Sequence, residues 1–299
     1  MNILITGAFR PEPWQTERIA ALGHTVYFLQ SEKDPLPLPY EEVEGAICNG
    51  LFLHHPIEKF TALSYVQLTS AGFDRMPMDY AAEKGITVHN ARGVYSIPMA
   101  EFSLSSVLAV YKQADHFRAA QGAHRWDKHR GLRELYGKRV CIVGCGNVGT
   151  EVARRFGAMG CEIIGVDAYP REDEHYTVML PVAELNTALM TADIVVLTLP
   201  LTPETRHLMG RDQLALLPEG CVLVNIARGG VMDTEALTET LVARKDLTAI
   251  LDVFEEEPLP ESSPLWEMDN AVLTPHNSFV GEGNARRLWQ VILANLQSV

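Results

Sequence analysis

The sequence predicts an α/β protein built from two doubly wound parallel sheets, and two observations lead to this fold class. The chain of 299 residues contains two separate series in which short runs of Ile, Val and Leu alternate with stretches of helical composition. Short apolar strands that alternate with helices are typical of parallel sheets covered on both faces. The length also suits two domains of ordinary size, each with its own core.

The first series occupies about the first hundred residues and predicts one small α/β domain. Segments of helical composition, such as Thr16–Leu22 and Met78–Lys84, lie between its apolar runs. The expected strands are Asn2–Thr6, Thr25–Leu29, Gly45–Cys48, Tyr65–Thr69 and Ile86–His89.

A long helix is expected where the first series ends. Ser96-Ile97-Pro98 resembles a helix start, with serine as the cap and proline in the first turn. The helix is expected to run from Met99 to about Ala120 and is largely apolar. Such a helix needs partners on more than one side, so we expect it to pack against the neighbouring domain, a second subunit, or both.

The second series predicts a complete dinucleotide-binding sheet, because it supplies six strands with intervening helices. A last helix, Glu282–Leu296, is expected to return to the first domain. We therefore expect a discontinuous domain of residues 1–95 plus 281–299 and an inserted domain of residues 96–280. The six strands are Arg139–Val143, Glu162–Asp167, Asp193–Thr198, Val222–Asn225, Ala249–Asp252 and Ala271–Thr274.

Composition and charge exclude several classes of partner. The formal net charge of −13 repels phosphate backbones, so we expect no nucleic-acid partner. No apolar run reaches the roughly 18 residues of a membrane span, and Met1–Gly7 does not resemble a signal peptide. We therefore expect a cytoplasmic protein. No metal site is expected, since the side chains of His54-His55 diverge and no third ligand is evident.

A glycine-rich turn, Gly144-Cys145-Gly146-Asn147-Val148-Gly149, follows the strand Arg139–Val143 and precedes a helix expected at Val148–Met159. This is the context that a dinucleotide-binding turn requires. Gly144 permits the tight turn, Gly146 lets a pyrophosphate approach the backbone, and Gly149 allows close packing of helix on sheet. A flavin or S-adenosylmethionine protein can share this turn.

Asp167 ends the second strand of this series, 18 residues beyond Gly149. A carboxylate there can accept hydrogen bonds from the adenosine ribose and would repel a 2′-phosphate. The sequence therefore predicts NAD rather than NADP as cofactor. Arg171 lies nearby, but Pro170 intervenes, and we expect it not to lie directly beside Asp167.

Three ionisable side chains suited to hydride transfer each follow a predicted strand. Removal of a hydroxyl proton calls for a base that titrates near neutrality, such as His276. A carboxylate substrate calls for a planar cation, which Arg228 provides. Glu257 is the third such side chain, in the segment after the strand Ala249–Asp252. Its neighbours Glu255-Glu256 are interpreted as part of a solvated acidic run.

Together these segments resemble the family of D-isomer-specific 2-hydroxyacid dehydrogenases. The resemblance extends over most of the chain, and its strongest motifs lie between Gly144 and His276. The matching segments are Ser70–Asp74, Gly144–Gly149 with Asp167, Leu199–Thr202, Asn225–Gly230, Asp252–Pro258 and Thr274–His276.

The resemblance implies a Rossmann NAD-binding domain inserted into a flavodoxin-like substrate domain. It implies an oxidoreductase that moves a hydride between nicotinamide and a D-2-hydroxy acid or 2-keto acid. His276 would be the acid–base residue paired with Glu257, and Arg228 would bind the substrate carboxylate. Asp252 would meet the nicotinamide end of the cofactor. The implied cofactor-binding set is Gly144, Gly146, Asn147, Val148, Gly149, Asp167, Leu199, Pro200, Thr205, Ala227, Arg228, Asp252, His276 and Ser278.

The resemblance also implies a substrate site in the interdomain cleft and a dimer. Backbone N–H groups of Ala71 and Gly72 would hold the substrate carboxylate, with Tyr95 and Arg228 also in the substrate site. The helix Met99–Ala120 and Trp126 resemble the arm through which family members form homodimers.

Departures from the family pattern fall around the expected substrate pocket. Tyr95, Phe279 and Phe52 could make the pocket apolar, or Tyr95 could supply a phenol donor. Either Arg92 or Arg10 is hypothesised to contact a second anionic group of the substrate, although pairing with surface acids is an equal alternative.

Two further functions are known on the same fold. Formate dehydrogenases pair their histidine with glutamine, which argues against that activity where the chain has Glu257. An NAD(H)-sensing corepressor-like binding protein is the alternative from another class.

Overall fold

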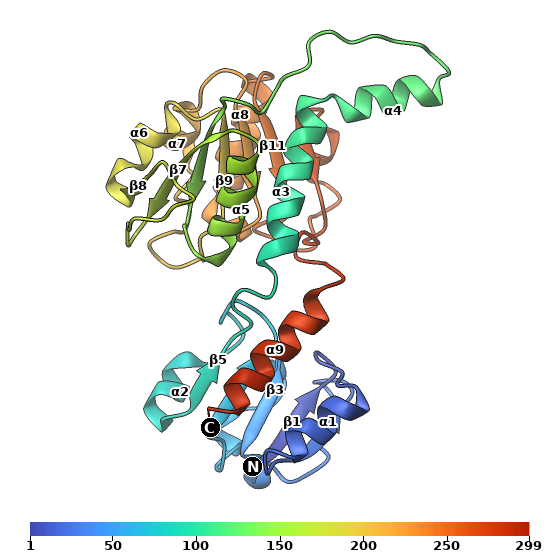
Figure 1. Cartoon of the computed structure of the whole chain (residues 1–299), viewed down its shortest axis with the longest axis vertical. Helices are drawn as coiled ribbons and strands as arrows, with labels where there is room; N and C mark the ends of the chain where they lie inside the picture. Colours follow the sequence, from blue (N-terminus) through green and yellow to red (C-terminus); the bar gives the residue numbers. More distant parts are fainter. Residues whose placement is uncertain (299) are drawn as a thin grey trace. The chain divides into compact units, whose positions relative to one another are not determined.

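The computed structural model describes residues 1–298 and divides into two compact units. One unit consists of Met1–Tyr95 and the described part of Gly281–Val299, and the other of Ser96–Val280. Each contains one parallel sheet with helices against it (Figure 1). The predicted fold class of two doubly wound parallel sheets is therefore confirmed.

The first unit has a five-stranded sheet in the order β2-β1-β3-β4-β5, with every pair parallel. Side chains alternate between its faces because successive strand residues point in opposite directions. Ile3 and Ile5 pack with α1 (Pro13–Ala20) and α9 (Asn284–Leu296), whereas Leu4 lies in the core of the other face with α2 (Met78–Lys84). The strands are β1 Asn2–Thr6, β2 Thr25–Leu29, β3 Gly45–Cys48, β4 Tyr65–Leu68 and β5 Thr87–His89.

The second unit has a seven-stranded parallel sheet in the order β12-β11-β10-β9-β6-β7-β8. The chain proceeds from β6 toward one edge and returns at β9 toward the other, so the strand order reverses between β6 and β9. Ligands of open α/β sheets bind at such a reversal, outside the carboxyl ends of the strands. The strands are β6 Arg139–Val143, β7 Glu162–Asp167, β8 Val178–Pro181, β9 Ile194–Leu197, β10 Val222–Asn225, β11 Thr248–Leu251 and β12 Ala271–Leu273.

Two layers of helices bury the faces of this second sheet. Val140 and Ile142 lie in one core with α3 (Ser96–Tyr111) and α5 (Asn147–Ala158). Cys141 and Val143 lie in the opposite core. That core is completed by α6 (Leu185–Leu189), α7 (Arg211–Ala215) and α8 (Thr234–Ala243).

Two predictions about this unit are wrong. The expected helix Met99–Ala120 is two helices, α3 and α4 (Ala114–Gly122), because Gln113 adopts a left-handed conformation with φ of 52°. The helix also begins at Ser96 itself rather than after it. The sheet has a seventh strand, β8, at an edge where its terminal proline is tolerated.

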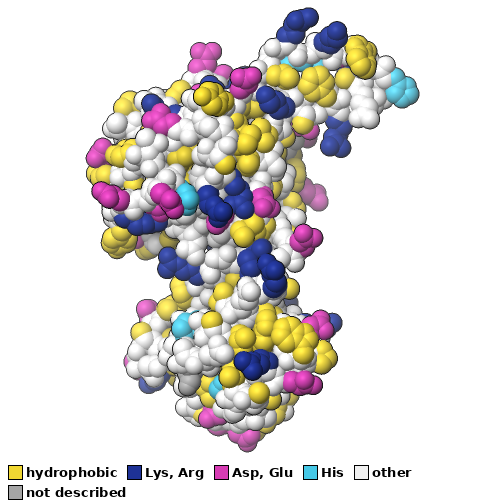
Figure 2. Space-filling model, in the orientation of Figure 1, with side chains coloured by type: hydrophobic (Ala, Val, Ile, Leu, Met, Phe, Trp, Pro, Cys, Tyr) yellow, Lys and Arg dark blue, Asp and Glu magenta, His cyan; other side chains and the backbone are white. Residues whose placement is uncertain are grey.

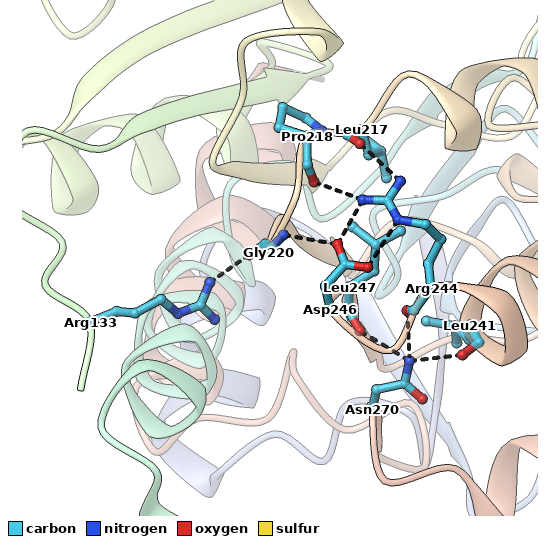
Figure 3. Close-up of polar contacts among 9 residues, drawn as sticks. All are labelled: Arg133, Leu217, Pro218, Gly220, Leu241, Arg244, Asp246, Leu247 and Asn270. Atoms are coloured by element: carbon cyan, nitrogen blue, oxygen red, sulfur yellow. Dashed lines mark hydrogen bonds and ion pairs between the residues drawn. The ribbon is translucent and has the colours of Figure 1, made fainter. Parts of the chain in front are cut away.

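A polar network closes the end of the second sheet opposite the carboxyl ends of its strands (Figure 3). Arg244 Nη2 lies 2.7 Å from Asp246 Oδ2, which also accepts a hydrogen bond from Gly220 N at 3.0 Å. Arg133 donates to the Gly220 carbonyl, and Asn270 Nδ2 donates to three carbonyls that precede β11. The carbonyl acceptors of Arg244 and Asn270 belong to Leu217, Pro218, Leu241, Arg244 and Leu247.

Side chains of both charge signs are interspersed over the face of the molecule shown in Figure 2. Within residues 1–298, no helix combines the length and the apolar character needed to cross a bilayer.

Candidate active site

The glycine-rich turn joins β6 to α5, and two of its glycines are required by close contacts. Gly144 has φ of 95°, and a Cβ there would lie 2.6 Å from Leu199 N. A Cβ on Gly149 would lie 2.2 Å from the Gly144 carbonyl oxygen. At Gly146, by contrast, a Cβ would have no described atom within 4 Å, so its backbone is open to a ligand. This arrangement has the open helix N-terminus that a pyrophosphate needs.

Asp167 lies at the end of β7 and contacts this turn directly. Its Oδ2 accepts a hydrogen bond from Cys145 N at 2.6 Å, and its Oδ1 accepts one from Tyr169 N at 2.9 Å. A carboxylate oxygen has two lone pairs, so each oxygen keeps acceptor capacity for a ribose hydroxyl. The glycine turn and Asp167 therefore fit an adenosine dinucleotide.

Arg171 also contacts the glycine-rich turn. Its Nη2 donates to the Cys145 carbonyl at 2.8 Å, while Asp167 accepts from the N–H of the same residue. The end of β7 and the segment after it thus bind both backbone polar groups of Cys145.

The side chains of His276 and Glu257 meet after the carboxyl ends of β12 and β11. His276 Nδ1 lies 2.8 Å from Glu257 Oε2, and the two side chains are 40% and 37% exposed. Glu257 Oε1 also accepts a hydrogen bond from Phe254 N at 3.0 Å. Because Glu257 engages Nδ1, Nε2 is the nitrogen through which His276 can exchange a proton with a ligand. The φ of His276 is 50°, an uncommon value for a non-glycine residue.

Asp252 is fully buried and organises the segment that carries His276. Its Oδ1 accepts hydrogen bonds from Thr274 Oγ1 at 2.6 Å and Asn277 N at 2.8 Å, and its Oδ2 accepts one from Ser278 N at 2.9 Å. His276 N itself donates to the Asp252 carbonyl at 2.8 Å. The predicted contact of Asp252 with the cofactor stays a prediction, but its hydrogen bonds show a second role in positioning the histidine.

Arg228 begins the turn after β10, which neighbours β11 in the sheet. Its Nη1 donates to the Ala227 carbonyl at 2.8 Å. The buried side chain of Asn225 fixes this turn, since its Oδ1 accepts from Ala227 N at 3.0 Å and its Nδ2 donates to the Arg228 carbonyl at 3.3 Å. β10, β11 and β12 are adjacent and parallel, so Arg228, Glu257 and His276 all follow the same edge of the sheet.

Most other predicted cofactor residues follow the same edge. Leu199 packs its backbone against Gly144, and Thr205 Oγ1 donates to the Pro200 carbonyl at 2.8 Å. The others in the set are Asn147 and Val148 in the first turn of α5, the buried Ala227 after β10 and the buried Ser278 after β12.

The predicted substrate residues Ala71, Gly72 and Tyr95 belong to the first unit. Asn90 Nδ2 donates to the Ala71 carbonyl, and Ser70 Oγ donates to the Gly72 carbonyl at 2.9 Å. Tyr95 Oη donates to the Thr69 carbonyl, and burial raises the pKa of this phenol. The phenol donor proposed for the pocket therefore binds the backbone after β4.

Sequence reasoning missed several residues that hold this site. Glu255 lies in an exposed acidic run, as expected, but it also makes specific contacts: its Oε1 lies 2.6 Å from His207 Nε2, and its Oε2 accepts from Thr234 N at 3.0 Å. Asn225, Asn90 and Thr274 were also not singled out, although Asn225 ends a strand and the other two each follow one, which is the signal that marked Arg228 and His276. No group of three or more His, Cys, Asp or Glu side chains among the described residues could hold a metal ion.

Residues 104–278 match the family described as "D-isomer specific 2-hydroxyacid dehydrogenase, NAD binding domain". The chain belongs to this family. The predicted family and the predicted cofactor, NAD, are therefore confirmed. As a family member, the chain carries the glycine turn and Asp167 in its NAD-binding domain.

Curated relatives of this 2-hydroxyacid dehydrogenase family member include oxidoreductases with several substrates. A D-3-phosphoglycerate dehydrogenase of Methanocaldococcus jannaschii is 37% identical over 81% of this chain, but the match spans only 47% of that protein. A hydroxypyruvate reductase of Thermotoga maritima is 37% identical over 74% of this chain and 72% of its own length.

A solved structure shares the architecture over almost the full length. A D-isomer specific 2-hydroxyacid dehydrogenase from Xanthobacter autotrophicus Py2, in complex with NADPH and MES, is 29% identical with a TM-score of 0.79. The similarity covers 99% of this chain and 95% of that one.

Proposed function

We propose that this protein catalyses hydride transfer between NAD(H) and a D-2-hydroxy acid or its 2-keto acid. The observation that carries the proposal is the 2.8 Å contact of His276 Nδ1 with Glu257 Oε2, at the sheet edge that also bears the glycine turn. A histidine held by a carboxylate can take and return a proton near neutral pH. The glycine turn and Asp167 would hold the cofactor, which would supply the hydride acceptor for C2 of the hydroxy acid, or the hydride donor in the reverse direction.

The proposed work of the protein's own residues is proton transfer and orientation. His276 Nε2 takes the proton of the 2-hydroxyl group, and in the reverse direction it gives that proton to the carbonyl oxygen. Glu257 holds the ring through Nδ1 and stabilises the imidazolium that forms. Arg228 binds the substrate carboxylate and polarises the carbonyl group. Asp252 is proposed to meet the nicotinamide end of the cofactor while positioning His276.

The proposed substrate site also includes the backbone N–H groups of Ala71 and Gly72, and Tyr95. Names of relatives point to small hydroxy acids, some of them phosphorylated. The backbone N of Arg92 donates to Asn90 Oδ1 at 3.2 Å, and Asn90 Nδ2 donates to the Ala71 carbonyl, so Arg92 lies on the segment that holds a proposed substrate residue. We therefore favour Arg92 as the group that contacts a second substrate anion.

A comparison of monoanionic and dianionic substrates tests this choice. Arg92→Ala should raise the KM for the 2-keto acid of 3-phosphoglycerate far more than the KM for glyoxylate. Equal increases for the two substrates would refute the role of Arg92, and the same pair of assays on Arg10→Ala tests the alternative.

Activity itself is tested by mixing the protein, NADH and a panel of 2-keto acids and following the loss of NADH absorbance. We expect turnover with at least one acid and its loss in His276→Asn, while His175→Asn, on the segment before β8, retains it. Tight NADH binding without turnover on any acid would overturn the proposal and favour an NAD(H) sensor.

We also propose a homodimer formed through α3, α4 and the segment after them. Trp126 in that segment is 92% exposed, and a side chain of this size is more often covered by a partner. Light scattering should give twice the chain mass at micromolar protein, and a monomer mass would refute the dimer.

A further inference from the structure

Glu255 joins three segments at the carboxyl edge of the second sheet. Its Oε1 lies 2.6 Å from His207 Nε2, in the segment after β9, and its Oε2 accepts from Thr234 N, the first residue of α8. The side chain is 28% exposed, and Arg206 Nη2 lies 4.0 Å away. Burial opposes ionisation, but the hydrogen bonds from Thr234 and His207 hold the pKa of this carboxyl below its usual value.

His207 is bound to the turn that begins at Arg228. Its backbone N donates to the Gly230 carbonyl at 2.8 Å, and its φ is 53°. Two residues later, Met209 N donates to the Val231 carbonyl at 3.1 Å. The backbone on both sides of the His207 side chain is therefore fixed to the segment that follows Arg228.

Glu255 lies on the segment that carries Glu257, and the backbone of this segment packs against the turn that begins at Arg228. A Cβ on Gly229 would lie 1.9 Å from Phe254 C and 2.3 Å from Glu255 N, so the two backbones are in direct contact there. Phe254 N, on the same segment, donates to Glu257 Oε1. Any separation of the two segments would thus move Arg228 and Glu257 relative to each other.

We propose that His207 and Glu255 are a positioning pair, which keeps the turn of Arg228 and the segment of Glu257 in register for catalysis. The His207–Glu255 contact and the backbone contact of Gly229 with Phe254 therefore join the same two segments. A hydrogen bond to a charged carboxylate is stronger than one between two neutral groups. The inference rests on the proposed function, because Arg228 and Glu257 are the groups whose positions it explains.

Three variants of the full chain test the pair. His207→Leu removes the side-chain bond, while His207→Gln keeps an N–H donor near the position of Nε2. Leucine and glutamine must both adopt the left-handed backbone conformation of residue 207. A difference between the two variants therefore reports the loss of the side-chain hydrogen bond. Arg211→Leu is the matched control, because it removes an exposed ion pair with Glu239 in the same unit.

Hydrogen–deuterium exchange gives a readout that does not depend on turnover. In His207→Leu we expect amides of residues 226–233 and 252–258 to exchange about tenfold faster, with Arg139–Val143 unchanged. His207→Gln and Arg211→Leu should match the wild type. Unchanged exchange in His207→Leu, or faster exchange throughout the unit, would overturn the proposal.

Steady-state kinetics supply the functional test. We expect His207→Leu to lower kcat about tenfold with the Kd for NADH unchanged, and His207→Gln to restore most of the loss. An unchanged kcat would overturn the positioning role. If the wild type turns over no 2-keto acid, the proposed function fails, and the exchange experiment still decides whether the pair holds the two segments together.

Discussion

Replacement of Asp252 by asparagine tests how the protein holds its histidine. The carboxylate is 0% exposed and accepts three hydrogen bonds from Thr274, Asn277 and Ser278 on either side of His276. The asparagine amide has one acceptor oxygen, which can replace Oδ1 and accept from Thr274 and Asn277. Its NH₂ group must then face Ser278 N, so two donors oppose each other in a buried site.

The expected cost follows from these contacts. One hydrogen bond to a charged group is lost, worth about 1.5–3 kcal/mol, and an unsatisfied buried N–H adds about 1–3 kcal/mol. We expect His276 to be displaced, with a loss of at least about 2 kcal/mol of transition-state stabilisation. A loss of this size corresponds to roughly a 30-fold fall in kcat/KM. Thr274→Val removes only the hydroxyl donor, and its effect should be a smaller fall in kcat/KM of about tenfold.

The assay is NADH consumption with the best 2-keto acid of the panel, accompanied by thermal unfolding of each variant. Thr238→Val is the matched control, because Thr238 Oγ1 donates to a carbonyl within α8 at 2.8 Å and has no contact with Asp252. If Asp252→Asn does not fold, Thr274→Val against Thr238→Val carries the test. A kcat/KM of either site variant equal to that of Thr238→Val would refute the reasoning.

Three further predictions concern the cofactor turn and the opposite edge of the sheet. Gly144→Ala should lower Tm and weaken NADH binding, because its φ and its contact with Leu199 exclude a Cβ, whereas Gly157→Ala in α5 should raise Tm. Asp167→Ala should raise the Kd for NADH about tenfold in a fluorescence titration, and an unchanged Kd would contradict its ribose role. The hydrogen bond from Arg244 lowers the pKa of Asp246, so the pair stabilises the fold above the carboxyl's ordinary pKa and loses this effect as pH falls. The Tm difference between wild type and Arg244→Leu should therefore narrow from pH 7 to pH 3, and a constant difference would contradict this.

Sequence patterns predicted the strands well where they contain a continuous apolar run. Gly45–Cys48 and Val222–Asn225 are fully buried and have the predicted bounds, and so does Thr25–Leu29, which is partly exposed, because each is a continuous apolar run. β8 was missed because it lies at an edge, is partly exposed and ends in proline, so it lacks the apolar run of a central strand. The break between α3 and α4 could not be predicted, since Gln113 is neither glycine nor proline.

The candidate site shows the same division between local and tertiary information. His276, Glu257 and Arg228 could be predicted because each follows a strand, and parallel strands bring their carboxyl ends to one edge. The partner of Glu255 could not, since His207 is 48 residues away and only the fold brings the two together. The contact of Arg171 with Cys145 likewise depends on the path of the segment after β7.

Direct hydride transfer is the central claim, and isotope transfer tests it most directly. The protein is incubated with NADH carrying deuterium at the transferable C4 position and with the panel of 2-keto acids, and the products are analysed by mass spectrometry and chiral chromatography. We predict a D-2-hydroxy acid with one deuterium at C2, formed by the wild type and not by His276→Asn. NADH that is bound but never yields a deuterated hydroxy acid, or a product of the L configuration, would contradict the account.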